Sequence, residues 1–207
     1  MASVIDAMDE MALNGLIEGC GRAATSRRFH GPAATLRMGV AELDRPTREH
    51  WQFFDESASG CVLVIATDGA EFTVLGGVAA AVAAARGVAG IVTDGGVRDV
   101  DEIARTGVPV RFAHHNPRSC AGGFKVLETG KSIIIGGQRI TPGDYLVSDS
   151  DGLVAIPALM TSAVLTRAAE IERHETKWAS AAASLRSVAS GYAAITTTAG
   201  TPGTKEN

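Results

Sequence analysis

The sequence predicts an α/β protein with a single compact domain. Its 207 residues, 45% hydrophobic and 20% charged, are enough for one sizeable core rather than two. The middle third alternates apolar runs with helix-like segments at the spacing of strand–helix units. Aromatic residues make up only 5% and the net charge is -4, which disfavours stacking platforms and basic stripes. We therefore expect no nucleic-acid partner.

The first third of the chain predicts a helix, a strand and a second helix. Apolar side chains recur at helical spacing over residues 4–18, which indicates an amphipathic helix or a pair of short turns, and Gly19 and Gly21 follow as terminators. The segment 30–35 is predicted to begin a strand. Residues 46–57 begin with a proline, which suits the first turn of a helix.

The middle third predicts buried strands that alternate with helices. Residues 61–66 are a continuous apolar run stopped by Asp68 and Gly69, which is typical of a strand buried on both faces. Gly76 and Gly77 then open an Ala-rich helix. The same alternation predicts helices over 78–86 and 100–105 and strands over 88–93 and 108–112.

The last third predicts short hairpins, a long helix and a tail. Short apolar runs between residues 122 and 157 are separated by turn pairs, and Pro142-Gly143 indicates a type II turn. The segment 149–152 imitates the start of a calcium loop but lacks the later ligands, so we interpret it as a hairpin turn. Beyond Pro157 the pattern is helical to about residue 188. We expect one domain over 1–189 and a disordered tail over 190–207.

Targeting signals are not apparent in this sequence. The three cysteines have no metal-ligand spacing, and an odd number cannot all pair within the chain, which fits a reducing compartment. The N-terminal residues lack a basic and apolar leader, and no apolar run approaches the ~20 residues of a membrane span. We therefore expect a cytoplasmic protein without a membrane partner.

The glycine pair Gly76-Gly77 is a candidate anion-binding turn. Glycines at the start of a helix let backbone N–H groups approach a ligand, and the helix dipole favours an anion there. A carboxylate or phosphate would dock on Gly77, Val78 and Ala79. The alternative, which the two glycines taken alone favour, is that they only make a tight turn with close helix–strand packing.

The dipeptide Arg98-Asp99 is the second candidate. It follows a predicted buried strand and the turn 94–96, at the strand end where open α/β sheets bind ligands. Arginine grips a carboxylate through two parallel hydrogen bonds, and aspartate binds hard cations such as Mg²⁺. The alternative is a salt-bridged helix start.

Two anion-binding turns on neighbouring strand–helix units would bracket an α-keto acid. Cleaving a carbon–carbon bond beside a keto group leaves an enolate, which needs either a lysine Schiff base or a metal ion. No lysine has an evident apolar pocket, so the metal route is favoured. The pair His114-His115 has no third ligand at zinc spacing. The lysines are Lys125, Lys131, Lys177 and Lys205.

Several motifs together resemble the RraA-like family, which includes the class II 4-hydroxy-4-methyl-2-oxoglutarate aldolases. Gly76-Gly77 is followed by the run 88–99, and the likeness continues through residues 107–110, 140–145 and 148–157. The resemblance implies a swivelling β/α fold in which a central β-barrel-like core lies between helical layers. It also implies a homo-oligomer, either a trimer or a hexamer built from two trimers.

The resemblance also implies roles for individual residues. In the aldolases, the residue matching Arg98 binds the pyruvoyl group, the residue matching Asp99 holds Mg²⁺ or Mn²⁺, and amides matching Val78 and Ala79 receive the substrate carboxylate. A glutamate from a neighbouring subunit's C-terminal helix joins the metal site. Glu175 is our match for this glutamate, and Glu172 is the alternative.

One position departs from the aldolase pattern. Counting back from Arg98, Gly77 stands where the aldolases carry an acidic residue. The resemblance therefore leaves two hypotheses. The first is a metal-dependent lyase that releases pyruvate from a 4-hydroxy-2-oxo acid and also decarboxylates oxaloacetate. The second is a non-catalytic regulator that binds and inhibits an endoribonuclease, as the founding member of the family does.

Overall fold

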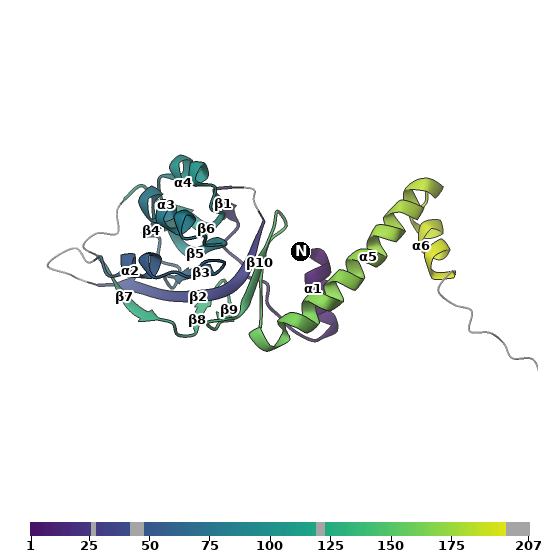
Figure 1. Cartoon of the computed structure of the whole chain (residues 1–207), viewed down its shortest axis with the longest axis horizontal. Helices are drawn as coiled ribbons and strands as arrows, with labels where there is room; N and C mark the ends of the chain where they lie inside the picture. The colour runs from purple at the N-terminus through teal and green to yellow at the C-terminus, as the bar shows by residue number, and fades with distance from the viewer. Residues whose placement is uncertain (26–27, 42–47, 119–122, 198–207) are drawn as a thin grey trace, which may run out of the picture.

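The computed structural model describes residues 1–25, 28–41, 48–118 and 123–197. Most strands belong to one curled sheet in the order β1-β6-β5-β3-β2-β10-β11, to which β4 adds beside β5 and β7 beside β2 (Figure 1). The mixed α/β class is therefore confirmed. The strands of this sheet are β1 (Arg22–Ala23), β2 (Phe29–Val40), β3 (Val62–Ala66), β4 (Thr73–Leu75), β5 (Gly90–Val97), β6 (Val110–His115), β7 (Phe124–Thr129), β10 (Tyr145–Ser148) and β11 (Leu153–Ile156).

The helices and a small hairpin complete the described chain. The central strands β2, β3, β5 and β6 run parallel, and α3 and α4 are the helices that connect β4 to β5 and β5 to β6. A separate hairpin joins β8 (Ile133–Ile135) to β9 (Gln138–Ile140). The helices are α1 (Ala2–Glu10), α2 (His50–Asp55), α3 (Gly77–Ala85), α4 (Val100–Thr106), η1 (Ala158–Met160), α5 (Thr161–Leu185) and α6 (Val188–Thr197).

Strand β3 lies at the centre of the core. All five of its residues are buried, which confirms the predicted strand that is covered on both faces. Successive side chains of a strand point to opposite faces. Leu63 and Ile65 accordingly pack in the cluster that includes α3 and α4, while Val62 and Val64 pack with the β8–β9 hairpin and β10.

The first helix is shorter than the predicted segment 4–18. It ends at Glu10, and Ala12 takes a positive φ of 55° that turns the chain out of the helix. Beyond this turn, Leu16 forms a β-bridge with Val154, and the Ile17 amide donates to the Leu153 carbonyl at 2.9 Å. The apolar residues near position 16 thus belong to the sheet edge rather than to a helix face.

Strand β5 is longer than the predicted segment 88–93. It continues to Val97 through residues 94–96, where a turn was expected, and it pairs there with β4, a strand that the sequence did not predict. The Gly96 amide donates to the Phe72 carbonyl at 2.7 Å, and a Cβ at Gly96 would meet that oxygen at 3.0 Å. These glycines therefore permit a close approach between strands rather than a turn.

The expected turns of the last third are present. The Asp149 amide donates to the Gly152 carbonyl at 3.1 Å and closes the hairpin between β10 and β11, as predicted. Gly143 has a φ of 92°, and the Asp144 amide donates to the Thr141 carbonyl at 3.0 Å. A positive φ at the third position of a hydrogen-bonded turn is the type II geometry that the sequence indicated.

The C-terminal helices extend away from the sheet. Helix α5 buries only Val164 and Ala168, and its far half packs with α6 as a projecting helical hairpin (Figure 1). Residues 190–197 lie in α6, although the sequence predicted a disordered tail from residue 190. The rest of that tail, like Pro46, lies outside the described residues. No helix in the described segments combines the length and apolarity needed to cross a membrane.

The buried His50 predicts a pH dependence of stability. This side chain is 7% exposed, its Nδ1 has no hydrogen-bond partner among the described residues, and burial lowers its pKa from the ordinary 6.5. Below pH 6.5 the unfolded chain takes up a proton that the folded chain resists, so stability falls as the pH decreases toward the lowered folded pKa.

We expect His50→Leu to flatten this dependence. Urea unfolding between about pH 7.5 and pH 5.5 should show a smaller loss of unfolding free energy for this variant than for the wild type. His174→Leu on the exposed part of α5 is the control and should keep the wild-type slope. Equal slopes for His50→Leu and the wild type would contradict the prediction.

Candidate active site at two neighbouring strand ends

Two turns meet because β4 and β5 are parallel neighbours. Leu75 at the end of β4 is paired with Val97 at the end of β5, so the residues that follow them lie side by side. Gly76-Gly77 follows the first strand and Arg98-Asp99 the second. The Arg98 amide also donates to the Leu75 carbonyl at 3.0 Å, which joins the two turns through the backbone.

Asp99 bridges the two turns through its side chain. Its Oδ2 accepts a hydrogen bond from the Gly77 amide at 3.1 Å and lies 3.5 Å from Arg98 Nε. Asp99 has a left-handed backbone conformation with φ 57° and ψ 40°, which costs about 1–3 kcal/mol for a residue other than glycine. Aspartate is among the few residues that tolerate this region. Arg98, Asp99 and Gly77 are thus brought together as one cluster.

The start of α3 presents backbone donors beside this cluster. Gly76 precedes the helix in an extended conformation and has no side chain with which to cap it, and the Asp99 side chain bonds only the first amide, that of Gly77. The Ala80 amide bonds to the Gly76 carbonyl at 3.1 Å, so the amides of Val78 and Ala79 belong to the open first turn. The Val78 side chain is 84% exposed. This helix end is able to receive an anion beside Arg98.

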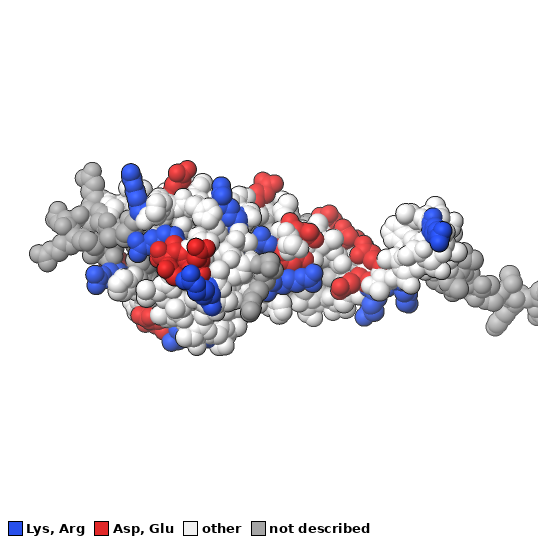
Figure 2. Space-filling model, turned by 90° about the horizontal axis from the view of Figure 1, so that it is seen from above, with Lys and Arg blue, Asp and Glu red and all other residues white. Residues whose placement is uncertain are grey.

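Charged side chains surround the turns. Arg98 and Asp99 remain 41% and 39% exposed, and α4 carries Asp101 and Glu102 in its first turn. Seen from the side of α3 and α4, a group of acidic side chains has basic side chains beside it (Figure 2). The site is accessible to a charged solute on this face.

Because Gly76 and Gly77 have no side chains, charged side chains of neighbouring residues approach their backbone closely. A Cβ at Gly76 would lie 2.9 Å from Asp99 Oδ2 and 3.2 Å from Arg98 Nε. At Gly77 a Cβ would lie 3.1 Å from Glu102 Cβ and 3.4 Å from its Oε2. The sequence did not single out Glu102, although an acidic residue three positions after Arg98-Asp99 on the next helix was a usable signal.

The residues present suit a magnesium-type ion better than zinc. No group of three or more His, Cys, Asp or Glu side chains that could hold a metal ion converges within the described segments, which disfavours any site preformed from protein ligands alone, the kind that zinc requires. Mg²⁺ takes one or two protein carboxylates and completes its shell with water and substrate oxygens. Asp99 offers such a carboxylate in a half-exposed position. A Mg²⁺ or Mn²⁺ ion held by Asp99 therefore fits the donor set.

The other predicted residues lie apart from the cluster or at its edge. Glu172 and Glu175 are exposed on α5, which runs away from α3 and α4 in the same chain (Figure 1). His114 and His115 end β6, where they pair with Gly96 and Val97 of β5. The histidine pair therefore lies at the end of β6, in a strand beside the cluster.

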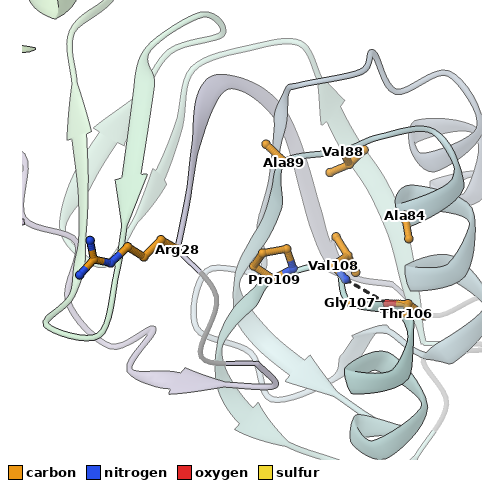
Figure 3. A pocket seen from close by; sticks show the side chains of 8 residues that line it. All are labelled: Arg28, Ala84, Val88, Ala89, Thr106, Gly107, Val108 and Pro109. Atoms are coloured by element: carbon orange, nitrogen blue, oxygen red, sulfur yellow. Dashed lines mark hydrogen bonds between the residues drawn. The ribbon is translucent and has the colours of Figure 1, made fainter.

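A separate pocket occurs at the opposite ends of β5 and β6. It encloses about 320 Å³ and is lined mainly by small apolar residues (Figure 3). The Arg28 side chain extends away from the rest of the lining, and the Val108 amide is bonded to Thr106 Oγ1 at 3.2 Å. None of the described residues that line it is acidic. The lining residues are Arg28, Ala84, Val88, Ala89, Thr106, Gly107, Val108 and Pro109.

Comparison with known proteins gives consistent matches. The family model described as RraA-like, Aldolase/RraA, matches residues 1–155. Relatives from Burkholderia mallei and Burkholderia pseudomallei are 38% identical over 138 residues, which are 65% of this chain and 79% of theirs. Their names assign them provisionally as 4-hydroxy-4-methyl-2-oxoglutarate aldolases.

Solved structures match over most of the chain. An uncharacterized protein from Pseudomonas syringae pv. tomato has a TM-score of 0.81 at 26% identity, with 92% of this chain and 90% of the other covered. Streptomyces coelicolor RraAS2, described as an unusual member of the RNase ES inhibitor RraA protein family, has a TM-score of 0.73 at 27% identity, with 84% and 88% covered.

Proposed function

The chain belongs to the RraA-like family, and from this membership we propose that it is a divalent-metal-dependent lyase. Its reaction is the cleavage of a 4-hydroxy-2-oxo acid of the 4-hydroxy-4-methyl-2-oxoglutarate type to pyruvate, accompanied by decarboxylation of oxaloacetate. The observation that carries the proposal is the bond from the Gly77 amide to Asp99 Oδ2, which unites the cation-binding and anion-binding turns. The names of the Burkholderia relatives support the same reaction.

The residues of the cluster have complementary roles in this proposal. The amides of Val78 and Ala79 bind the substrate carboxylate, and the Arg98 guanidinium pairs with the pyruvoyl oxygens. Asp99 holds Mg²⁺ or Mn²⁺, which would supply a Lewis acid that polarises the keto oxygen. Arg98 and the helix amides orient the keto acid so that the scissile bond is beside Asp99.

A pyruvate assay tests the proposal. The purified protein is mixed with Mg²⁺ or Mn²⁺ and either oxaloacetate or 4-hydroxy-4-methyl-2-oxoglutarate, and pyruvate is followed through lactate dehydrogenase. We expect saturable release that disappears with a chelator. Metal and substrate without protein give the background rate, and a rate equal to this background for both substrates would refute the lyase.

A regulator of an endoribonuclease is the second candidate. A Thermus thermophilis structure described as the RNA-processing inhibitor RraA matches with a TM-score of 0.63 at 27% identity, with 74% of this chain and 92% of the other covered. The missing acid at Gly77 also favours it. A binding assay with a purified endoribonuclease and its RNA substrate separates the candidates. Inhibition without pyruvate release supports the regulator, and pyruvate release without inhibition supports the lyase.

We further propose that the active form is a homo-oligomer, a trimer or hexamer, in which α5 contacts a neighbouring subunit. Beyond Ala168 no described residue of α5 is fully buried, although Ile171 packs partly against the core, and this length carries Glu172 and Glu175. Most soluble oligomers are symmetric homo-oligomers, and this exposed length of α5 would lie at such an interface. In this arrangement Glu175 reaches the partner's Asp99 site.

The oligomer proposal makes a prediction for Glu175→Gln. Light scattering after size exclusion should give the mass of at least three chains for both wild type and variant. We expect kcat/KM for oxaloacetate to fall about 10–100-fold in the variant, because outer ligands of metal sites have effects of that size. Glu172→Gln tests the alternative glutamate, and we expect it to have little effect because Glu175 is the assigned match. A monomeric wild type, or equal rates, would contradict the prediction.

A further inference from the structure

The end of β6 is joined to its neighbours by Asn116, the first residue after the strand. The Asn116 amide donates to the Val97 carbonyl at 3.1 Å, and the Asn116 carbonyl accepts from Thr73 Oγ1 at 2.5 Å. Its side-chain Nδ2 donates to the Glu71 carbonyl at 2.5 Å. Asn116 therefore ties β6 to β5 and to the start of β4, directly beside Arg98, which follows Val97 in the chain.

Asn116 also directs the chain that leaves β6. Its Oδ1 accepts a hydrogen bond from the Arg118 amide at 3.0 Å, which is the turn that asparagine side chains form with the amide two residues ahead. Pro117, which lies between them, has a fixed φ. Both backbone groups and both polar side-chain atoms of Asn116 thus have partners, and the backbone of Arg118 is held in place.

The Arg118 guanidinium, in contrast, is free. The side chain is exposed, and among the described residues it has neither an ion pair nor a side-chain hydrogen bond. Arg111 of β6 instead donates to Ser148 Oγ at 3.1 Å, and Arg98 Nε lies 3.5 Å from an Asp99 oxygen. Arg118 is thus a positive charge at a fixed place that no described acid neutralises.

Arg118 lies at the same edge of the sheet as the candidate site. Strands β5 and β6 are parallel and Val97 pairs with His115, so the chain leaves both strands on the same side. Neighbouring strands are about 4.8 Å apart. Arg118 comes three residues after His115, a span of at most about 11 Å. The long Arg118 side chain can therefore reach a molecule that is held at Arg98.

The two cationic positions suit the two ends of a dicarboxylic acid. Strands β4 and β6 flank β5 on opposite sides, so Arg118 lies across Arg98 from the first turn of α3. In the proposed function, this turn and Arg98 bind the carboxylate and the keto group. A second carboxylate would then meet the acids Asp99 and Asp101 unless a cation lay nearby. Arg118 provides that cation.

We propose that Arg118 binds the second carboxylate of a 2-oxo dicarboxylic acid, and that Asn116 positions Arg118 for this contact. A guanidinium matches a carboxylate through two parallel hydrogen bonds. This inference rests on the proposed function, which places the first carboxylate at the amides of α3. It makes the protein selective for 2-oxo acids with a carboxylate at each end over those with one uncharged end.

Binding of two matched ligands tests the inference without turnover. 2-Oxoglutarate and 2-oxopentanoate have the same carbon chain, but only the first has a second carboxylate, and neither has the 4-hydroxyl group that cleavage requires. With Mg²⁺ present, titration calorimetry of the wild type should give a Kd about 10–100-fold lower for 2-oxoglutarate. Arg118→Gln should remove this preference and leave the Kd of 2-oxopentanoate unchanged. Arg105→Gln, at the far end of α4, is the matched control and should keep the preference.

Asn116→Ala tests the positioning role. We expect this variant to lose most of the preference for 2-oxoglutarate, because Arg118 is no longer held, while the Kd of 2-oxopentanoate changes little. Asn116→Ser is the conservative variant and should keep more of the preference, since a serine hydroxyl makes the same turn more weakly. Equal weakening of both ligands would show a purely structural role and overturn the assignment of Asn116. Thermal unfolding of each variant verifies that it is folded.

Arg98→Gln separates this inference from the proposed function. Both ligands carry the carboxylate and keto group that Arg98 would bind, so this variant should weaken both. If Arg98→Gln weakens both ligands while Arg118→Gln changes neither Kd, the site stands and the role of Arg118 is wrong. If the wild type binds neither ligand, or Arg98→Gln changes neither Kd, the site of the proposed function fails and this inference fails with it.

Discussion

Asp99→Asn is expected to lower kcat/KM for metal-dependent pyruvate release by about 10²–10³-fold, the range for losing one strong electrostatic group at a reacting centre. The substitution changes charge with little change of shape. Asparagine tolerates the left-handed conformation of residue 99, and its side-chain oxygen still accepts from the Gly77 amide. The measurement is the lactate dehydrogenase-coupled rate at saturating Mn²⁺ and varied oxaloacetate.

The control for this effect is Asp101→Asn, which removes an exposed carboxylate two residues away on α4. Its rate should stay close to that of the wild type, and both variants should keep the wild-type melting temperature. A rate loss shared equally by the two variants would indicate a long-range charge effect instead of a cation site at Asp99.

Leu63→Ala is expected to have the largest effect on stability, with about 2–5 kcal/mol lost from the free energy of unfolding. Leu63 is 0% exposed in β3, between the parallel strands β2 and β5, so the deleted carbon atoms leave a cavity that the sheet cannot close. A loss of this size is a large share of the stability of an ordinary domain. Urea unfolding followed by circular dichroism measures it.

Leu159→Ala is the matched control, because the same atoms are deleted from a side chain that is 97% exposed in η1. Its unfolding free energy should lie within about 0.5 kcal/mol of the wild type. A loss confined to this variant at high protein concentration would identify a contact between copies of the chain at Leu159. Similar losses for both variants at low concentration would contradict the placement of β3 in the core.

The elements that could be predicted from the sequence are those whose local residue pattern has a single physical explanation. The unbroken apolar run of β3 arises from burial on both faces, and Gly76-Gly77 does mark the start of α3. Strand β4 was missed because it has only three residues. The end of β5 was mistaken for a turn, since Asp94 and two glycines have turn-like composition there.

Tertiary contacts explain why Asp94 occurs within a strand. Asp94 accepts hydrogen bonds from the Thr67 amide at 2.6 Å and the Gly69 amide at 3.0 Å, and so stabilises the turn after β3. Neither bond is visible in a linear pattern, because the partners are separated by more than twenty residues of sequence. The same limit applies to Glu102, whose relation to Gly77 appears only when α3 and α4 are placed together.

The backbone connection between the two turns has a consequence for how this site changes during evolution. The Arg98 amide, the Leu75 carbonyl and the pairing of Leu75 with Val97 hold the turns together without using the side chains that would perform chemistry. Acidic side chains can therefore be gained, lost or moved between helices while this backbone frame, the paired ends of β4 and β5, stays intact. A frame with this independence would allow descendants of one ancestor to exchange catalysis for binding, and to regain it, through few substitutions.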